Sequence, residues 1–317
     1  MYNESRKELY IREYSSNIKT QNALATAFNA IEPYEVEYGK DLCAFNAHEL
    51  TESLPKVSGV RYITHVERLG LYRRYVRWCI ANQFPDACDS IEHYQADNHE
   101  KLRQRFISGP AHLQHVLNAM FLSEDENTMD NVYRAFFWLT FSGMYPDDIL
   151  RVRRDEVNLA RMTVEFAGDE YPIYRESIIA LEKCKTRDTF FVIRERPGRQ
   201  PQKILMQRFE PTLLICGVRA MPGMREITQR ISNKSRAARQ QGKTDMQLTP
   251  QRAWLSGLFY RAFELERFGI APDFYSTVVR YISHKGNLDV EDRQVKKYMK
   301  ECANSYMHDY EIWKALF

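Results

Sequence analysis

The sequence lacks the short motifs that mark the best-known nucleotide, hydrolase and metalloprotease sites. It contains no Gly-x-Gly-x-x-Gly, no complete Gly-x-x-x-x-Gly-Lys-Ser/Thr loop, no Gly-x-Ser-x-Gly and no His-Glu-x-x-His, so these enzyme classes have no starting point. His112 and His115 share one predicted helix face, but no Cys or carboxylate beside them completes a metal-ligand pattern. We therefore expect neither a metal ion nor a cofactor.

Paired cysteines and long apolar runs are also missing. The six cysteines are scattered without a Cys-x-x-Cys pair, which argues against a zinc site and, in the absence of a secretion signal, against a disulfide framework. Buried free thiols are the expected state. No stretch approaches the roughly 18 uncharged apolar residues that a membrane helix needs, and the first residues lack the basic-then-apolar order of a signal peptide. We expect a cytoplasmic protein without membrane contact.

The chain as a whole lacks a strong excess of charge of one sign. Its 317 residues carry a formal net charge of +3, which by itself does not indicate nucleic-acid binding. Between residues 191 and 245, however, twelve Lys or Arg stand against four Asp or Glu. Clustered cations attract a phosphate backbone because they release its condensed counterions. The alternative is a solvated basic face without a ligand.

The first part of the chain, up to about residue 87, has the spacing of helices. Leu24, Phe28 and Ile31 recur three or four residues apart and form one apolar face. Prolines and glycines divide the segment into about four helices, at Pro33, Gly39, Pro55, Gly59 and Pro85. The last helix, residues 62–83, is expected to bury five aliphatic side chains: Val66, Leu69, Leu71, Val76 and Ile80. This pattern predicts a small all-helical module.

Polar and charged residues separate this module from the rest of the chain. Residues 88–109 hold few apolar side chains and indicate an interdomain linker. After Pro110 the spacing predicts helices over 113–122 and 129–141, a hairpin around 158–173, and a helix from 177. A strand at 190–193 and helices at 226–241, 253–268, 276–283 and 290–303 follow. We predict a mainly α fold with a small β-sheet, with domains at 1–87 and 110–317.

The segment 131–150, NVYRAFFWLTFSGMYPDDIL, predicts a helix, a glycine turn and a second helix opened by a proline and two acids. It resembles the core of the tyrosine recombinases, the phage-integrase family. This resemblance implies an N-terminal helical core-binding-type domain that clamps DNA from one side, followed by a catalytic-type domain. It also implies a role in DNA recombination or in mobile genetic elements. Double-stranded DNA is then the expected partner.

Most of the catalytic positions implied by the resemblance carry other residues here. The family has an arginine straight after the glycine turn, where this chain has Tyr145, and a His-x-x-Arg cluster after a Thr-Pro, where it has Gln251 and Trp254. The hairpin turn at 168–170, which carries a lysine in the family, holds glycine and two acids. Guanidinium groups are needed to hold the charged transition state of phosphodiester transfer. The sequence therefore predicts a degenerate catalytic centre.

Two residues are candidates for a residual catalytic role. His284 follows an apolar helix, in the place of the family's third cluster, and histidine titrates in the range that suits a proton donor. A surface or capping role is the alternative. Tyr298 stands fourteen residues further on, beyond the usual spacing of the family's nucleophile, with Tyr306 and Tyr310 as further candidates. Packing of the tyrosine ring on a C-terminal helix is the other interpretation.

The expected contacts with DNA are phosphate contacts, which position a protein on the duplex rather than specify a sequence. One set of cations lies on the last helix of the N-terminal module, namely Arg73, Arg74 and Arg77. The opposing set lies in the second domain, namely Lys234, Arg236, Arg239 and Arg252.

The sequence thus predicts a DNA-binding protein of the tyrosine recombinase type that acts by binding rather than by cutting. One open alternative is an active divergent recombinase that forms a 3'-phosphotyrosyl DNA intermediate through Tyr298, with His284 and displaced arginines such as Arg151 or Arg252. The other is a helical protein-interaction scaffold without a nucleic-acid role. The aromatic C-terminal segment 306–317 suits self-association, so a homo-oligomer is also expected.

Overall fold

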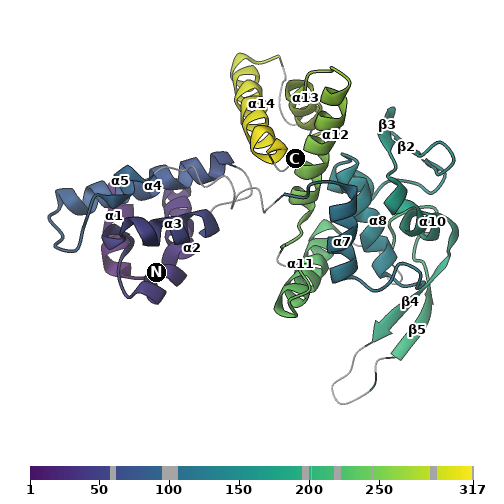
Figure 1. The fold of residues 1–317 in the computed structure, drawn as a ribbon, viewed down its shortest axis with the longest axis horizontal. Coiled ribbons are helices and arrows are strands. Elements are labelled where there is room, and N and C mark those ends of the chain that lie inside the picture. Colours follow the sequence, from purple (N-terminus) through teal and green to yellow (C-terminus); the bar gives the residue numbers. More distant parts are fainter. Residues whose placement is uncertain are drawn as a thin grey trace. The chain divides into compact units, whose positions relative to one another are not determined.

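The computed structural model describes residues 1–57, 62–94, 106–194, 200, 202–217, 223–244, 246–285 and 291–315. The chain divides into two compact units, whose helices and strands are labelled in Figure 1. Unit 1 comprises Met1–Arg103 with Phe274–Ile312, and unit 2 comprises Gln104–Asp273 with Trp313–Phe317. Residues 95–105 of the predicted linker lie outside the described part of the chain.

The described residues of unit 1 form helices joined by loops. The elements are α1 (Glu4–Tyr14), α2 (Ile18–Tyr38), the 3-10 helix η1 (Leu42–Ala44), α3 (Ala47–Val57), α4 (Tyr62–Ala81), α5 (Ser90–His93), α13 (Phe274–Lys285) and most of α14 (Arg293–Lys314). The N-terminal helices α1 to α5 and η1 share one core. Its largest fully buried rings belong to Phe28, Phe45, Tyr72 and Tyr75.

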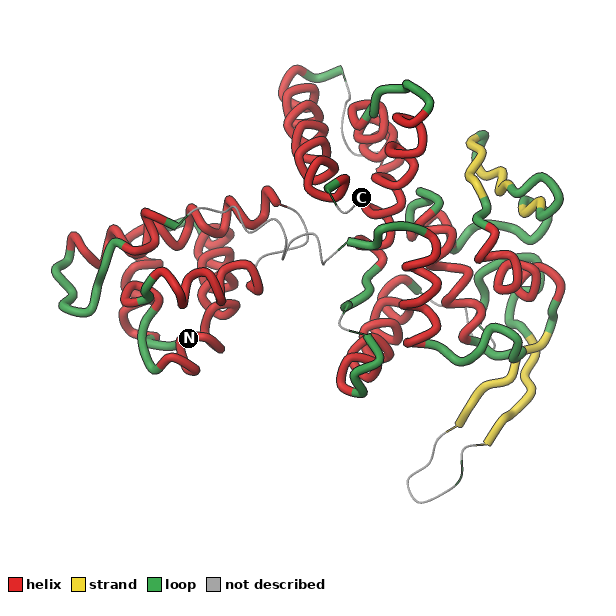
Figure 2. Tube along the Cα trace, viewed as in Figure 1, coloured by secondary structure: helices red, strands yellow, loops and turns green. Residues whose placement is uncertain are grey.

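Unit 2 combines helices with two small antiparallel sheets, which are drawn in yellow in Figure 2. Its elements are α7 (Pro110–Met120), α8 (Asp130–Phe141), α9 (Pro146–Ile149), β1 (Val157–Asn158), β2 (Thr163–Phe166), β3 (Asp169–Pro172), the 3-10 helix η2 (Arg175–Ser177), α10 (Ile178–Thr186), β4 (Thr189–Arg194), β5 (Gln202–Gln207), α11 (Met224–Gln240) and α12 (Pro250–Arg267). One sheet has the order β1-β2-β3, and β4 pairs with β5. The predicted fold class, mainly α with a small sheet, is confirmed.

Helix α8 lies at the centre of unit 2. All of its 12 residues are buried, and α12 and α10 pack against it. Helix α12 approaches closely because Gly257 faces the backbone of α8, where a Cβ would overlap the Phe141 carbonyl oxygen. The long aromatic run of α8 therefore fills a core that other helices enclose on several sides, as expected for a helix that is apolar all round.

Three predictions about elements are wrong. Val66 and Ile80 are 39% and 42% exposed, because α4 buries its tyrosine and cysteine face rather than a purely aliphatic one. Pro33 lies inside α2 instead of ending it, and the helix ends at Gly39, whose positive φ of 66° suits glycine. Helix α14 continues past residue 303 to Lys314, because its later apolar positions keep the helical spacing.

Four of the six cysteines are buried thiols without a disulfide, as predicted, and Cys88 and Cys302 are half-buried. Strand β5, which pairs with β4 over six residues, has no counterpart among the predicted elements. Within the described residues, every helix is too short or too polar to cross a bilayer.

Candidate functional site

Two aromatic residues, at the positions where the resembling family has its two catalytic arginines, are in contact with each other. Tyr145 is the N-cap of α9 and Trp254 lies in the first turns of α12. Their ring centroids are 5.3 Å apart with an interplanar angle of 30°. Trp254 is only 8% exposed, and its indole N–H donates to the Gly143 carbonyl oxygen at 3.2 Å. The pair packs as part of the junction between α8, α9 and α12, and neither ring can carry the positive charge of a guanidinium.

An arginine does lie near this junction, but it binds backbone. Arg261 Nη1 donates to the Phe141 carbonyl oxygen at 2.8 Å, at the C-terminal end of α8, where a cation is favourable for the helix dipole. Its guanidinium covers Gly143, which has φ 101° and has no room for a Cβ. Burial raises the pKa of the neighbouring Tyr174 to about 12, although a hydrogen bond from Arg261 opposes that rise. Arg261 and Trp254 thus tie α12 to the end of α8.

The remaining aligned positions of α12 are less enclosed. Gln251 is exposed in the first turn. The next residue, Arg252, is half-buried, and its Nη1 donates to the Gln247 carbonyl oxygen at 2.7 Å. Thr249 caps the helix by accepting from the Arg252 backbone N–H, as the sequence pattern Thr-Pro predicts for a helix N-terminus.

The β2–β3 hairpin carries negative charge. Its turn is formed by Ala167 and Gly168, which both have positive φ, so Asp169 and Glu170 begin β3 instead of belonging to the turn. An open hollow of about 570 Å³ beside the hairpin is lined by Asp155, Glu156, Asn158, Glu165, Ala167, Gly168, Asp169 and Glu170. Among the described residues, no group of three or more side chains is arranged to hold a metal ion. Five carboxylates in one hollow repel a phosphate backbone.

Helix α11 has a basic outer face. Its Ile227, Ile231 and Ala238 are buried against unit 2, whereas Arg236 and Arg239 are exposed on the opposite side. Lys234 lies between these faces and forms an ion pair with Asp130 at 2.8 Å.

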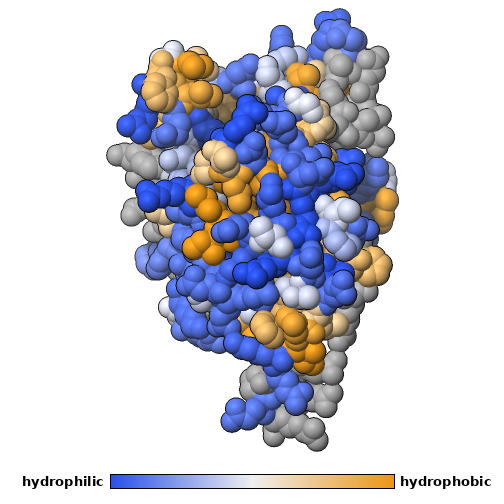
Figure 3. Space-filling model, turned by 90° about the vertical axis from the view of Figure 1, so that its right-hand side faces the viewer, coloured by the Kyte–Doolittle hydropathy of each residue, from blue (hydrophilic) through white to orange (hydrophobic). Residues whose placement is uncertain are grey.

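The face shown in Figure 3, on the side of the two hairpins of unit 2, is mostly hydrophilic with separate apolar patches.

The three arginines of α4 differ in what they contact. Arg73 is half-buried and donates to the carbonyl oxygens of Ile91 and Tyr94 at 3.2 and 2.6 Å. Arg77 forms a two-point ion pair with Glu92 at 2.8 and 2.6 Å. Arg74 is exposed, and its guanidinium lies 5.7 Å from the centre of the Tyr14 ring. Among these three arginines, Arg73 and Arg77 make described hydrogen bonds to oxygen atoms, whereas the described contact of Arg74 is with an aromatic ring.

The candidate catalytic pair lies in the other unit from Tyr145 and Trp254. His284 belongs to α13, but its side chain is outside the described part of the structure. Tyr298 lies on α14 and is 53% exposed. Tyr306 and Tyr310 of the same helix are buried.

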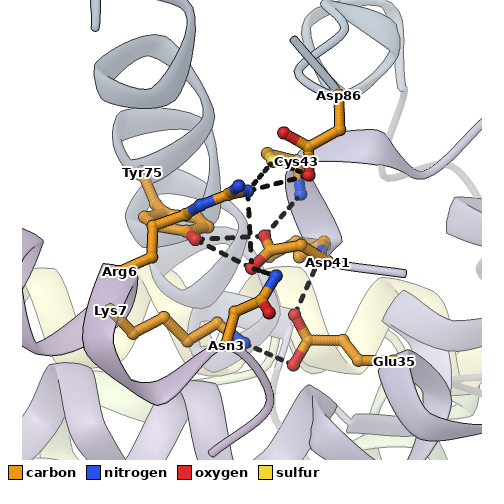
Figure 4. Close-up of polar contacts among 9 residues, drawn as sticks. Asn3, Arg6, Lys7, Glu35, Asp41, Cys43, Tyr75 and Asp86 are labelled. Carbon is orange, nitrogen blue, oxygen red and sulfur yellow. Dashed lines mark hydrogen bonds and ion pairs between the residues drawn. The ribbon is translucent and has the colours of Figure 1, made fainter. Parts of the chain in front are cut away.

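A buried polar cluster in unit 1 was missed by the sequence analysis (Figure 4). Lys7 and Glu35 form an ion pair whose side chains are both 0% exposed, and Glu35 also accepts from the Leu42 N–H at 2.8 Å. The Tyr75 hydroxyl donates to the buried Asp41 carboxylate at 3.0 Å. The one available signal was the position of Lys7, three and four residues before the buried Tyr10 and Ile11 on the same face of α1.

Residues 1–81 match the family model described as "MrpR, N-terminal core-binding domain". This is a domain of tyrosine-recombinase-type proteins, and the match covers helices α1 to α4 of unit 1. A search of curated proteins finds no match for the chain. The core-binding domain supports the coarse family resemblance and a DNA-binding protein of the recombinase type.

Proposed function

We propose that this chain binds double-stranded DNA in the cytoplasm as a member of the tyrosine recombinase type whose catalytic set has been lost. The observation that carries the proposal is the Tyr145–Trp254 ring contact in a chain with a core-binding domain. Removing a single donor to a developing oxyanion typically costs about 10²- to 10³-fold in rate. A centre that lacks the two guanidinium groups is therefore too slow to catalyse strand exchange.

The acidic hairpin supports the same conclusion. The resemblance expects a lysine there to protonate the departing oxygen, whereas this hairpin carries Asp169 and Glu170. Carboxylates cannot supply that proton, and their charge opposes the approach of a phosphodiester. The hollow with five acidic side chains therefore belongs to a surface that faces away from DNA.

We assign the strongest phosphate contacts to the exposed arginines Arg236 and Arg239 of α11 and Arg74 of α4. Their guanidinium groups are directed outward from a helix, which lets them bind phosphate oxygens as a planar fork. Arg77, Lys234 and Arg252 contribute after exchanging or sharing their present partners, and Arg73 acts by holding the end of α5. The proposed domains are a clamp at 1–87, a linker at 88–109 and a recombinase-like domain at 110–317.

The test is a titration of duplex DNA at several salt concentrations with the double variant Arg236→Ala/Arg239→Ala. Each lost phosphate contact lowers the slope of log K against log salt by about 0.9, so we expect a decrease of about two. Affinity is expected to decrease equally for unrelated DNA sequences, because phosphate contacts carry no sequence information.

A matched control is Arg12→Ala/Arg267→Ala, which removes two exposed arginines that form local ion pairs. The control changes the net charge equally and is expected to leave the salt slope unchanged. An unchanged slope in the Arg236/Arg239 variant, or an equal loss in the control, contradicts the proposal. Absence of any salt-dependent DNA binding by the wild-type chain favours the interaction scaffold instead.

Self-association through the C-terminal helix is part of the proposal. Helix α14 exposes Tyr298 and Met307 beside several Lys and Arg side chains. Sedimentation of the chain with and without duplex DNA distinguishes a monomer from an oligomer that assembles on the DNA.

A further inference from the structure

Strand β5 has an open hydrogen-bonding edge in unit 2. Figures 1 and 2 show the β4–β5 ribbon projecting from the helices of this unit. The ribbon consists of two strands, which pair over six residues. Two strands alone form a sheet of marginal stability in water, whereas three or more strands with an apolar face are stable. The proposed DNA contacts give this ribbon no role.

The edge of the ribbon along β4 is covered by the chain itself. The Phe191 N–H donates to the Asn127 carbonyl oxygen at 2.8 Å, and the Phe191 carbonyl oxygen accepts from the Met129 N–H at 3.3 Å. The backbone groups of Phe191 therefore point away from β5. Two residues directly opposite each other in an antiparallel pair either exchange both hydrogen bonds or neither. Leu205, the partner of Phe191, consequently points its own backbone groups away from β4.

The alternation along the strand fixes which residues form the open edge. Lys203 and Gln207 lie two residues from Leu205 and share its orientation, so these three residues direct their N–H and C=O groups outward. Apart from the β4–β5 ladder, no hydrogen bond of the described residues uses these backbone groups. At Phe209 the outward N–H already donates to the Gly217 carbonyl oxygen at 2.8 Å. The open edge therefore ends at Gln207.

The side chains along this edge allow a further strand to pair with it. Leu205 is 55% exposed, and Gln207 is exposed and uncharged. Charged side chains, especially lysine, often protect a sheet edge against pairing. The lysine of this strand, Lys203, instead has its ammonium group paired with the Glu126 carboxylate at 2.6 Å. The edge thus combines an exposed leucine with an ion-paired lysine and a neutral amide.

We propose that β5 pairs in the antiparallel sense with β5 of a second copy of this chain, with the two Leu205 residues opposite each other on a two-fold axis. In this register Lys203 lies opposite Gln207 of the second copy, so every outward N–H and C=O group gains a partner. A shift by two residues leaves the groups of one outward residue in each strand unpaired. The register also keeps like charges apart, which would destabilise the pair if they were directly opposite.

The pairing converts two ribbons into one four-stranded sheet with the order β4-β5-β5-β4. Each Leu205 then lies between Phe191 of its own β4 and the other Leu205, which gives one face a row of four apolar side chains. On the opposite face, Ile204 lies opposite Met206 of the second copy. A two-fold contact of this kind is closed, so it forms a dimer and does not propagate into a fibre.

Sedimentation velocity of the full-length protein without DNA tests this interface, at concentrations from about 1 to 100 µM. Because the shared edge is six residues long, we expect a weak dimer within this range. Leu205→Lys places two ammonium groups opposite each other and is expected to raise the dimer dissociation constant by roughly tenfold or more. Leu265→Lys is the matched control, at a leucine of α12 that is 47% exposed, and is expected to leave the constant unchanged.

Two outcomes of the sedimentation experiment overturn the proposal. A wild-type chain that stays monomeric shows that a second copy does not occupy the edge and leaves it to a strand of another protein. A dimer that Leu205→Lys does not weaken assigns self-association to another surface, such as α14. Because no DNA is present, failure of the proposed function does not affect either result.

Disulfide trapping tests the register, with the wild type and its native cysteines as background. Cα atoms in a hydrogen-bonded antiparallel pair lie about 5.5 Å apart, within the range that a disulfide spans. Leu205→Cys is therefore expected to form a covalent homodimer on mild oxidation. A mixture of Ile204→Cys and Met206→Cys is expected to form a heterodimer, whereas Ile204→Cys alone is not. Efficient trapping of Ile204→Cys alone, or no trapping of Leu205→Cys, overturns the proposed pairing.

Discussion

At the residue scale, the buried ion pair of Lys7 and Glu35 shows how much unit 1 depends on polar contacts in its core. Both side chains are 0% exposed, so both charges have been removed from water. The attraction between them offsets this desolvation only while both partners are present. Lys7 also lies 5.3 Å from the centre of the Phe28 ring, which adds a cation–π contact to the pair.

Removing one charge of this pair is expected to lower the free energy of unfolding more than removing both charges does. Glu35→Gln keeps an acceptor for the Leu42 N–H but leaves the Lys7 ammonium without its carboxylate, which costs about 3–5 kcal/mol of unfolding free energy. Adding Lys7→Met replaces the ammonium by an apolar group of similar length, so the double variant is expected to regain most of that loss. Urea unfolding followed by circular dichroism measures both. Additive losses in the double variant would show that the two charges do not compensate each other.

The Arg6–Asp86 pair makes a prediction about pH. A hydrogen bond from Arg6 lowers the pKa of Asp86 below its ordinary value of 3.8. A carboxylate with a lower pKa in the folded state stabilises the fold above its unfolded pKa, and this contribution disappears as pH falls through the folded value. Asp86 is more than a third exposed, so the contribution is about 0.5 kcal/mol.

Thermal unfolding of wild type and Asp86→Asn between pH 7 and pH 2 tests whether the stabilisation by Asp86 decreases as the pH falls. The wild type is expected to be more stable by that small margin near neutral pH, and the difference is expected to vanish in acid. A difference that grows as the pH falls contradicts the assignment.

At the element scale, the contact of α12 with α8 depends on one glycine. A Cβ on Gly257 would overlap the carbonyl oxygen of Phe141, and backbone atoms cannot rotate away as a side chain does. We expect Gly257→Ala to lower the free energy of unfolding by about 3 kcal/mol through overpacking. Gly70→Ala is the matched control, because its Cβ meets only the Arg74 side chain at 3.9 Å.

In the control, alanine replaces a half-buried glycine inside a helix, so stability is expected to rise by about 0.5–1 kcal/mol. In denaturant unfolding, the same substitution of glycine by alanine is therefore expected to lower the free energy of unfolding at position 257 and to raise it at position 70. Equal effects at the two positions would mean that α8 and α12 do not pack as closely as described.

The same scale explains which elements the sequence could predict. Spacing of apolar residues located α8, α10, α11 and α12 because each buries one continuous face or its whole surface. It also located α4 and the burial of Leu69 and Val76, but it missed that the buried face of α4 uses Tyr72, Tyr75 and Cys79, residues that also occur on surfaces. Strand β5 was missed because its exposed and half-exposed residues have no apolar face, so only pairing with β4 defines it.

The site was predictable in part for a similar reason. The aligned positions Tyr145 and Trp254 do come into contact, because order along the chain fixes which turns meet at the end of α8. The partners of the arginines were not predictable. Arg73 and Arg77 contact α5 and its neighbours, and such pairings depend on tertiary packing that no local pattern records. The buried Arg134 and Arg208, which donate to loop carbonyl oxygens, were missed for the same reason.

At the scale of the whole molecule, the residues with proposed functions are divided between two units. The core-binding match belongs to unit 1, and the aromatic junction, the acidic hollow and the basic face of α11 belong to unit 2. A net charge of +3 is compatible with DNA binding because acidic and basic side chains occupy different surfaces of unit 2. Salt screens such exposed charges within about 10 Å at 0.1 M, so a local basic face can bind phosphate beside an acidic hollow.

The proposed loss of catalysis concerns the whole molecule, because strand exchange needs groups from several elements at once. We expect wild-type protein to form no covalent adduct with a nicked suicide duplex, since Tyr145 and Trp254 supply no guanidinium to the transition state. Tyr298→Phe is then expected to bind DNA with unchanged affinity. Denaturing electrophoresis of the protein–DNA mixture measures the adduct. An adduct that forms with wild type and disappears in Tyr298→Phe would instead establish an active recombinase, with the exposed Tyr298 as its nucleophile.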